Sequence, residues 1–211
     1  MSANLALIAL GANLSSSAGP PAETLRIALG LISDQPDIII QAVSRLYVTP
    51  AHPPDSGPDY INACATLRSS LNPEKTLAVL HRIEALLGRH RDGHRWAARG
   101  IDLDLIAMDQ LVVPDIPGHD RWRNLSPDQQ MMQAPDQLIL PHPRLQDRAF
   151  VLAPLADIAP GWRHPRLDLT VMEMLTALPA TDRKSLRIML DNPYGTDQLT
   201  VSASDLIRTD R

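Results

Sequence analysis

Strand-like and helix-like segments alternate over residues 5–107, and their order limits the folds that this chain can adopt. Apolar residues recur with helical spacing in two stretches, residues 23–34 and 72–88. Four other stretches are apolar or β-branched runs between turn residues, and they are predicted to be strands: residues 5–10, 38–49, 60–67 and 101–107. The order β-α-β-β-α-β predicts an α+β sandwich, with one antiparallel sheet and helices on one face.

The second helical stretch has the clearest boundaries in the sequence. Asn72 can cap its first turn, Pro73 suits the first helical position and Gly88 suits the C-terminal end. Between these ends an apolar stripe recurs at helical spacing: Leu77, Leu80, Ile83 and Leu87. The segment is therefore predicted to be an amphipathic helix.

Beyond residue 107 the regular patterns become sparse. Residues 108–137 are rich in Pro, Asp and Gln, have no periodicity, and are predicted to be a long insertion. Weaker patterns predict three short elements: a strand at 138–140, a helix at 171–178 and an edge strand within 185–190. We expect one domain over residues 1–180 and a C-terminal extension of unknown role over residues 181–211.

Composition and charge bound the class of protein. With 211 residues, of which 44% are apolar, the chain can bury one normal core. A formal net charge of −4 argues against a general nucleic-acid or membrane-surface protein, and the N-terminal apolar run is too short for a signal peptide or a membrane span. The single cysteine, Cys64, cannot form an internal disulfide and is expected in the core. We expect a cytoplasmic monomer with no nucleic-acid or membrane partner.

Positive charge is concentrated in residues 89–99. Only two of the 20 basic residues are lysines, so chance would place about one arginine in a window of this length. The window contains four: Arg89, Arg91, Arg95 and Arg99. A guanidinium group can donate two parallel hydrogen bonds to phosphate oxygens and stays charged at any working pH, which favours a polyphosphate ligand. A solvated surface loop is the alternative.

Two carboxylates follow in a predicted strand. Asp102 and Asp104 are two positions apart and must point to the same face, while Ile101, Leu103 and Leu105 point to the other. Adjacent carboxylates repel each other, so the strand either has one solvated face or binds a cation. Hard oxygen ligands in this number suit Mg²⁺, which takes further ligands from water and substrate phosphates. The aspartates and the arginines together predict a nucleotide phosphate site, and no P-loop motif is present.

Two other functions stay open at this point. His90 and His94, with one of the aspartates, could form a zinc hydrolase site, although Gly93 weakens a helical spacing of the two histidines. The arginines could instead serve a catalytically inactive nucleotide- or RNA-binding module, against which the acidic net charge speaks. Tightly retained zinc would favour the first alternative, and RNA binding with a steep salt dependence and no AMP formation would favour the second.

Six segments resemble one enzyme family in order and approximate spacing. They span roughly residues 5–160 and are IALGANL, SRLYVTP, DYINACATL, LHRIEALLGRHR, RWAARGIDLDLI and PHPRLQDRAFVLAPL. The family is 6-hydroxymethyl-7,8-dihydropterin pyrophosphokinase. The resemblance implies a ferredoxin-like α+β fold and an enzyme of folate biosynthesis. Such an enzyme transfers diphosphate from ATP to the hydroxymethyl group of the pterin, releases AMP and uses two Mg²⁺ ions.

The resemblance also implies roles for individual residues. Asp102 and Asp104 match the magnesium ligands, and the arginines that match the catalytic loop are Arg89, Arg91, Arg95 and Arg99. The positions that match contacts with ATP are His81, Glu84, Arg89, Arg91, Arg95, Trp96, Arg99, Ile101, His142 and Arg148. Those that match the pterin pocket are Thr49, Pro50, Tyr60, Asn62, Trp96 and Phe150. His81 departs from the glutamine expected at its position.

The chemistry of the pterin agrees with these residue types. A flat bicyclic ring can be held between aromatic faces such as those of Tyr60 and Phe150, the one phenylalanine of the chain. Asn62 offers both a donor and an acceptor for the amide edge of the ring. Because water competes with the pterin hydroxyl, the loops at 51–59 and 88–98 are expected to close over the site.

Overall fold

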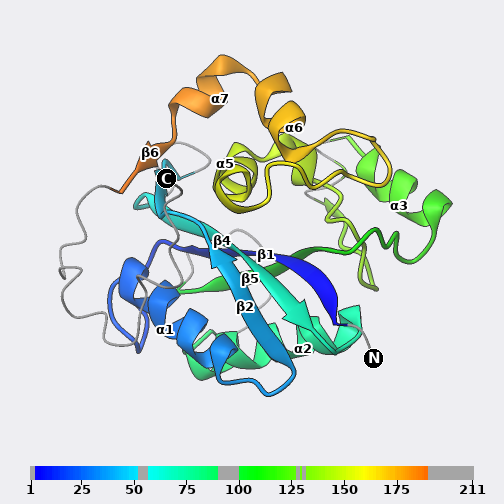
Figure 1. Ribbon diagram of the computed structural model, residues 1–211. Coiled ribbons are helices and arrows are strands. Elements are labelled where there is room, and N and C mark those ends of the chain that lie inside the picture. The colour runs from blue at the N-terminus through cyan, green and yellow to red at the C-terminus, as the bar shows by residue number, and fades with distance from the viewer. Residues whose placement is uncertain (1–2, 52–56, 90–99, 127–128, 130–131, 190–211) are drawn as a thin grey trace.

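The computed structural model describes residues 3–51, 57–89, 100–126, 129 and 132–189. A single six-stranded sheet runs through this part of the chain (Figure 1). Its strands are β1 (Asn4–Ala12), β2 (Ile38–Val43), β3 (Tyr47–Thr49), β4 (Tyr60–Ser69), β5 (Asp102–Met108) and β6 (Arg187–Ile188). The order is β5-β1-β4-β3-β6, β2 also pairs with β4, and all pairings are antiparallel. The predicted α+β class and antiparallel sheet are confirmed.

The stretch 38–49 forms two strands, so the prediction of one strand there was wrong. Tyr47 lies four positions after Val43, whereas their partners Ala65 and Asn62 on β4 are three positions apart. The extra residue interrupts the ladder between β2 and β3. Ser44, next to Val43, bridges the break because its hydroxyl accepts a hydrogen bond from the backbone N–H of Cys64 at 2.9 Å.

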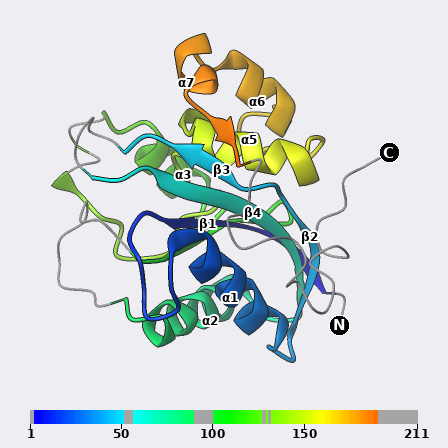
Figure 2. The same cartoon turned by 90° about the vertical axis from the view of Figure 1, so that its left-hand side faces the viewer.

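Two helices cover the first face of the sheet. They are α1 (Pro21–Ser33) and α2 (Pro73–Leu86), and Figure 2 shows them side by side along that face. As predicted, the side chain of Asn72 accepts a hydrogen bond from the backbone N–H of Lys75 at 2.9 Å and caps α2. Gly88 follows the helix with a φ of 86°, a conformation that glycine adopts without strain.

Helices also cover part of the second face, which corrects the expectation of helices on one face alone. The main one is α5 (Ala149–Ile158), and α6 (Val171–Ala177) packs on it (Figure 1). Leu7, Cys64 and Ile106 are fully or almost fully buried with Val151 and Leu152 of α5 in a second apolar core. A sheet whose central strands are apolar on both sides needs cover on both sides. The core position expected for Cys64 is confirmed.

The predicted insertion contains a helix, α3 (Ile116–Arg123). The carboxylate of Asp115 starts it by accepting a hydrogen bond from the backbone N–H of Gly118 at 2.7 Å. The predicted strand at 138–140 is reduced to an isolated bridge between Val113 and Leu140.

The C-terminal part of the described chain adds three short elements. The predicted helix at 171–178 is confirmed as α6, and α7 (Ala180–Lys184) follows it. The predicted edge strand is confirmed as β6, which pairs with β3. No described helix is long and apolar enough to cross a membrane.

Candidate functional site

The second face of the sheet changes from apolar to polar within a few residues. On β1, Leu7 lies in the core under α5, whereas the pairing partners of Gly11 are Asn62 on β4 and Asp102 on β5. Because paired residues share a face, these three positions form one row across the sheet. Ala9 lies between Cys64 and Asp104 in the next row. The polar end of this face is the candidate site.

Gly11 is a member of the site that sequence reasoning missed. The first strand was expected to end at residue 10, but β1 continues to Ala12 and contains Gly11 in the polar row. A Cβ atom at this position would lie 3.1 Å from Oδ1 of Asn62, which is tighter than ordinary packing. A glycine inside a strand often marks such a close approach, and this signal could have identified the residue.

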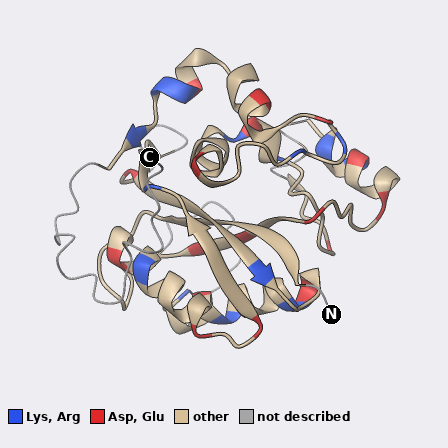
Figure 3. Ribbon diagram, viewed as in Figure 1, with Lys and Arg blue, Asp and Glu red and all other residues tan. Residues whose placement is uncertain are grey.

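Asp102 and Asp104 share the second face, as strand alternation requires. Both side chains are half-buried, whereas Leu103 and Leu105 are buried in the first-face core. Asp102 accepts a hydrogen bond from Nη1 of Arg89 at 2.5 Å. Within the described residues Asp104 has no hydrogen bond or ion pair, and no group of three or more His, Cys, Asp or Glu residues there could hold a metal ion. The acidic residues of β5 stand out in Figure 3.

Glu84 and Arg89 join the end of α2 to the edge strand β5. The Glu84 carboxylate is buried, accepts a hydrogen bond from the backbone N–H of Leu103 at 2.7 Å and pairs with Arg89. Burial opposes the charge of Arg89, but Asp102 and Glu84 outweigh it and raise its pKa. Arg89 is therefore a fixed cation between two carboxylates. Glu84, which was expected to face the nucleotide, lies against the backbone of β5.

His142 lies beside β5 as a neutral imidazole. Its backbone N–H donates to the carbonyl of Ile106 at 2.7 Å, and its Nδ1 accepts from the backbone N–H of Arg144 at 3.1 Å. Burial and the neighbouring Arg148 and Arg144 hold its pKa well below the usual value. Because Nδ1 is an acceptor, the single ring proton lies on Nε2, which donates to no described residue.

Arg148 differs from Arg89, the other described arginine of the site, because no described carboxylate pairs with it. Its guanidinium lies 5.6 Å from the ring centre of Phe150, and within the described residues it forms no ion pair. Burial lowers its pKa, while the charges of Asp104 and Asp102 oppose that effect. A half-buried cation without a salt bridge favours an anionic ligand, because such a ligand would restore the interactions lost on desolvation.

Two expected pterin residues are in direct contact. Nδ2 of Asn62 donates to Oγ1 of Thr49 at 2.8 Å, and both side chains are buried. Tyr60 pairs with Thr49 across the ladder and is half-buried on the same face. Phe150 in the first turn of α5 and Pro50 after β3 are both exposed. The structure thus brings Thr49, Asn62 and Tyr60 together on one face of the sheet.

Of the remaining residues expected to bind ATP or the pterin, two are described by the structure and the others are not. His81 is half-buried on α2, one turn before Glu84, and Ile101 is fully buried in the first-face core, so only its backbone can face a ligand. Several expectations lie outside the described residues: Arg91, Arg95, Trp96, Arg99, the zinc alternative based on His90 and His94, and most of the two loops expected to close.

Comparisons with known proteins identify one family. Residues 7–160 match the family described as 7,8-dihydro-6-hydroxymethylpterin-pyrophosphokinase (HPPK). A 2-amino-4-hydroxy-6-hydroxymethyldihydropteridine pyrophosphokinase of Synechocystis sp. is 36% identical over 176 residues, which are 83% of this chain and 77% of that protein. Its counterpart from Pseudomonas aeruginosa is 34% identical over 172 residues, which are 82% of this chain and 90% of that protein.

Solved structures show the same fold. The crystal structure of wild-type Plasmodium falciparum HPPK-DHPS superposes with a TM-score of 0.59 at 16% identity and covers 82% of this chain. The matched part is only 44% of that longer protein, so the chain spans less than half of it. At this identity the similarity concerns the fold alone.

Proposed function

Because the chain belongs to the 7,8-dihydro-6-hydroxymethylpterin-pyrophosphokinase family, we propose that it transfers diphosphate from MgATP to the hydroxymethyl group of 6-hydroxymethyl-7,8-dihydropterin and releases AMP. The observation that carries the assignment of the site is the polar row of Asn62, Gly11 and Asp102, with Asp104 beside it. This row places an amide that can recognise the edge of the pterin and a pair of carboxylates on one face of the sheet. We further propose that the protein acts as a cytoplasmic monomer, with the pyrophosphokinase domain in residues 1–180 and an extension in 181–211.

The carboxylate pair suits magnesium. Asp102 and Asp104 offer hard oxygen ligands on one face, and Asp104 keeps both oxygens free of partners within the described residues. Two protein ligands are typical of Mg²⁺, which retains waters and binds substrate phosphates. When bound, magnesium offsets phosphate charge and makes a coordinated hydroxyl more acidic. The residues present therefore fit magnesium, and we propose two such ions, as the resemblance to the family implies.

The triphosphate is bound by the cations around this pair. Arg148 supplies a guanidinium that no described carboxylate neutralises, and Nε2 of His142 supplies a neutral N–H donor. Arg89 is held in place by Glu84 and Asp102. We propose that Arg91, Arg95 and Arg99 complete the phosphate site. Preorganised donors of this kind stabilise charge that develops on the departing phosphate oxygens, each by ~3 kcal/mol.

The pterin is oriented by the buried amide of Asn62. Its Nδ2 already donates to Thr49, which fixes the rotation of the side chain and leaves Oδ1 to accept an N–H from the pterin edge. Gly11 keeps this oxygen uncovered, since any side chain there would crowd it. Tyr60 and Phe150 are proposed to contact the faces of the ring.

In the transfer, the pterin hydroxyl oxygen forms a bond to the β-phosphorus of ATP. The bond from that phosphorus to the oxygen bridging the α- and β-phosphates breaks, AMP leaves with this oxygen, and the proton of the hydroxyl is released to water. Positioning and charge stabilisation supply most of the rate in such reactions. His142 does not suit the role of general base, because Nδ1 accepts a backbone hydrogen bond and Nε2 carries the proton. Among the described residues we assign no other base.

One assay tests the proposal. The protein is incubated with MgATP and 6-hydroxymethyl-7,8-dihydropterin, and nucleotides and pterins are separated by chromatography. We expect AMP and the pterin diphosphate in equal amounts. Omission of the pterin should abolish AMP formation. Water is then the one remaining acceptor of the diphosphate, and we expect the site not to transfer diphosphate to water. Production of ADP, or no turnover of ATP in the presence of the pterin, would contradict the proposed reaction.

A further inference from the structure

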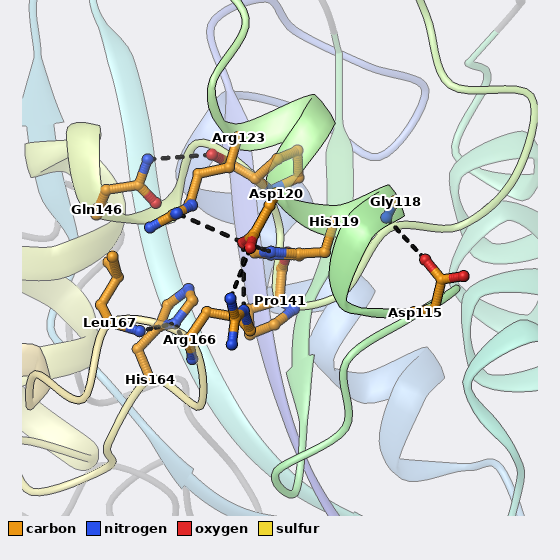
Figure 4. Close-up of polar contacts among 11 residues, drawn as sticks. Asp115, Gly118, His119, Asp120, Arg123, Pro141, Gln146, His164, Arg166 and Leu167 are labelled. Carbon is orange, nitrogen blue, oxygen red and sulfur yellow. Dashed lines mark hydrogen bonds and ion pairs between the residues drawn. The ribbon is translucent and has the colours of Figure 1, made fainter.

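A second polar cluster contacts the segment that carries His142. It joins α3 of the insertion to residues 141–146 and 162–167 (Figure 4). Two of its members, His119 and His164, are fully buried, and their rings are 5.9 Å apart between centres. Fully buried histidines are uncommon, and they indicate a built feature when their hydrogen bonds are specific. The group His119, Asp120, His164 and Arg166 is called the histidine clamp below.

His119 holds the backbone immediately before the nucleotide segment. Its Nε2 is 3.0 Å from the carbonyl oxygen of Pro141, which can only accept, so Nε2 carries the proton and donates (Figure 4). Pro141 precedes His142, whose own N–H is bonded to Ile106 of β5. The peptide between Pro141 and His142 is therefore fixed on both sides, by the insertion and by the strand that carries the aspartates.

Asp120 fastens α3 to the segment after α5. Its carboxylate accepts from Nη2 of Arg166 at 2.6 Å and from Nε at 3.2 Å, and Arg123 lies 3.4 Å away (Figure 4). The hydrogen bonds from Arg166 lower the pKa of Asp120. A two-pronged guanidinium contact fixes the angle as well as the distance between two segments.

His164 connects the clamp to the end of β5 through Trp162. Its Nδ1 accepts from the backbone N–H groups of Arg166 and Leu167 at 3.1 and 3.3 Å, which shapes the turn that presents Arg166. Its ring is 5.9 Å from that of Trp162, whose Nε1 donates to the carbonyl of Asp109, the residue after β5. Contacts thus run from the end of β5 through the clamp to Pro141, and from there to β5 again.

We propose that the histidine clamp is a positioning device for the nucleotide, in which His119 sets the location of His142 and, through the turn that follows, of Arg148. This inference rests on the proposed function of the site. The clamp residues do not touch the polar row of the sheet, so they act through the segment that they hold. The inserted residues 108–137 acquire a role by this reasoning, because they supply both His119 and Asp120.

The test compares two replacements of His119. His119→Gln keeps an N–H donor near the place of Nε2, whereas His119→Leu fills the volume and leaves the carbonyl of Pro141 without its donor. For His119→Leu we expect the KM for ATP and the Kd of a non-hydrolysable ATP analogue to rise about tenfold, because small displacements of binding groups are costly. The KM for the pterin should stay within about twofold, and His119→Gln should restore most of the ATP affinity.

Arg163→Ala is the matched control. Arg163 pairs with Asp168 at 3.2 Å in the same segment, but both side chains are exposed and neither belongs to the clamp. Its removal should leave both KM values unchanged. Asp120→Asn, which weakens the pairing with Arg166 without changing shape, should raise the Kd of the ATP analogue in the same direction by a smaller factor. This variant carries the test if His119→Leu does not fold.

Several results would overturn the proposal. They are an unchanged Kd of the ATP analogue in a folded His119→Leu protein, an equal rise in both KM values, and failure of His119→Gln to restore affinity. For Asp120→Asn, an unchanged Kd has the same meaning. If the wild-type protein binds the ATP analogue but forms no AMP, the proposed reaction fails, while the comparison of analogue affinities still decides the role of the clamp.

Discussion

The candidate site and the histidine clamp contain the same kinds of residue but use them in opposite ways. In the clamp, Asp120 is paired with Arg166, and the histidines are buried and donate or accept within the protein. In the site, Asp104 and Arg148 have no ion pair within the described residues. Asp102 of the site does pair with Arg89, but Asp104 and Arg148 illustrate the difference. Charge left without a described partner is available to a ligand, whereas charge neutralised within the chain holds segments together.

The two regions also differ in what they contribute to stability. Half-buried charges that lack partners cost free energy, and a bound ligand of opposite charge restores it. The clamp pays no such cost at Asp120, because its partner belongs to the same chain. Replacements in the site should therefore affect activity more than stability, and replacements in the clamp should affect stability as well.

The largest effect is expected for Asp104→Asn and Asp102→Asn. Each removes a proposed ligand of magnesium, which is worth several kcal/mol, so turnover should fall about a thousandfold or more. The melting temperature of Asp104→Asn should change little, because the repulsion with Asp102 that is relieved offsets the lost attraction to Arg148. AMP formation and thermal unfolding measure the two quantities. Near-normal turnover in either variant would remove the aspartates from the mechanism.

Arg148→Gln should lower kcat/KM by about a hundredfold or more, as expected for the loss of one well-placed charged donor. Stability should be unchanged or higher, because a half-buried cation without a salt bridge is removed. Arg144→Gln is the matched control, since Arg144 pairs with Asp147 at 3.1 Å in a partly exposed ion pair. If both variants lose activity equally, Arg148 has no special part in binding.

Acid should weaken the clamp. Burial, with the nearby His119, Arg123 and Arg166, lowers the pKa of His164 to about 4, below the ordinary value of 6.5. The unfolded chain therefore binds more protons between these values, and stability is lost as the pH falls from about 6.5 towards 4, by up to about 3 kcal/mol.

Denaturant unfolding at a series of pH values measures this loss. His164→Asn keeps an acceptor for the turn at Arg166 and Leu167 but cannot be protonated in this range. The variant should show a flatter dependence of the unfolding free energy on pH. The same slope as in the wild type would mean that His164 is not the titrating group.

The smallest effect is expected at the C-terminal edge strand. Arg187 pairs with Asp59 at 2.7 Å, but both side chains are largely exposed, and such pairs contribute about 0–1 kcal/mol. Arg187→Ala should therefore lower the unfolding free energy by no more than about 1 kcal/mol. The KM for the pterin should not change. A marked rise in that KM would show that the extension shapes the pocket, and residues 181–211 would then belong to the working domain.

Local patterns predicted the parts of the fold that depend on neighbours in the chain. The cap at Asn72, the stripe of α2 and the shared face of Asp102 and Asp104 follow from helix and strand periodicity. The break between β2 and β3 was missed, because a single extra residue leaves no trace in a β-branched run. The cover of the second face by α5 was missed for another reason. Apolar residues on both sides of a strand show that cover is needed but do not identify the segment that provides it.

Residue identity and spacing in the chain sufficed for most of the order of elements over residues 5–107, the carboxylate pair and the resemblance to one family. The neighbours of Gly11 and the partners of His119 could not be obtained in this way. Asn62, Gly11 and Asp102 come from three strands, and the histidine clamp draws its members from segments more than forty residues apart. Such contacts depend on sheet register and on packing between distant segments. These are properties of the folded chain, because the free energy of each contact is gained only after the chain has closed around it.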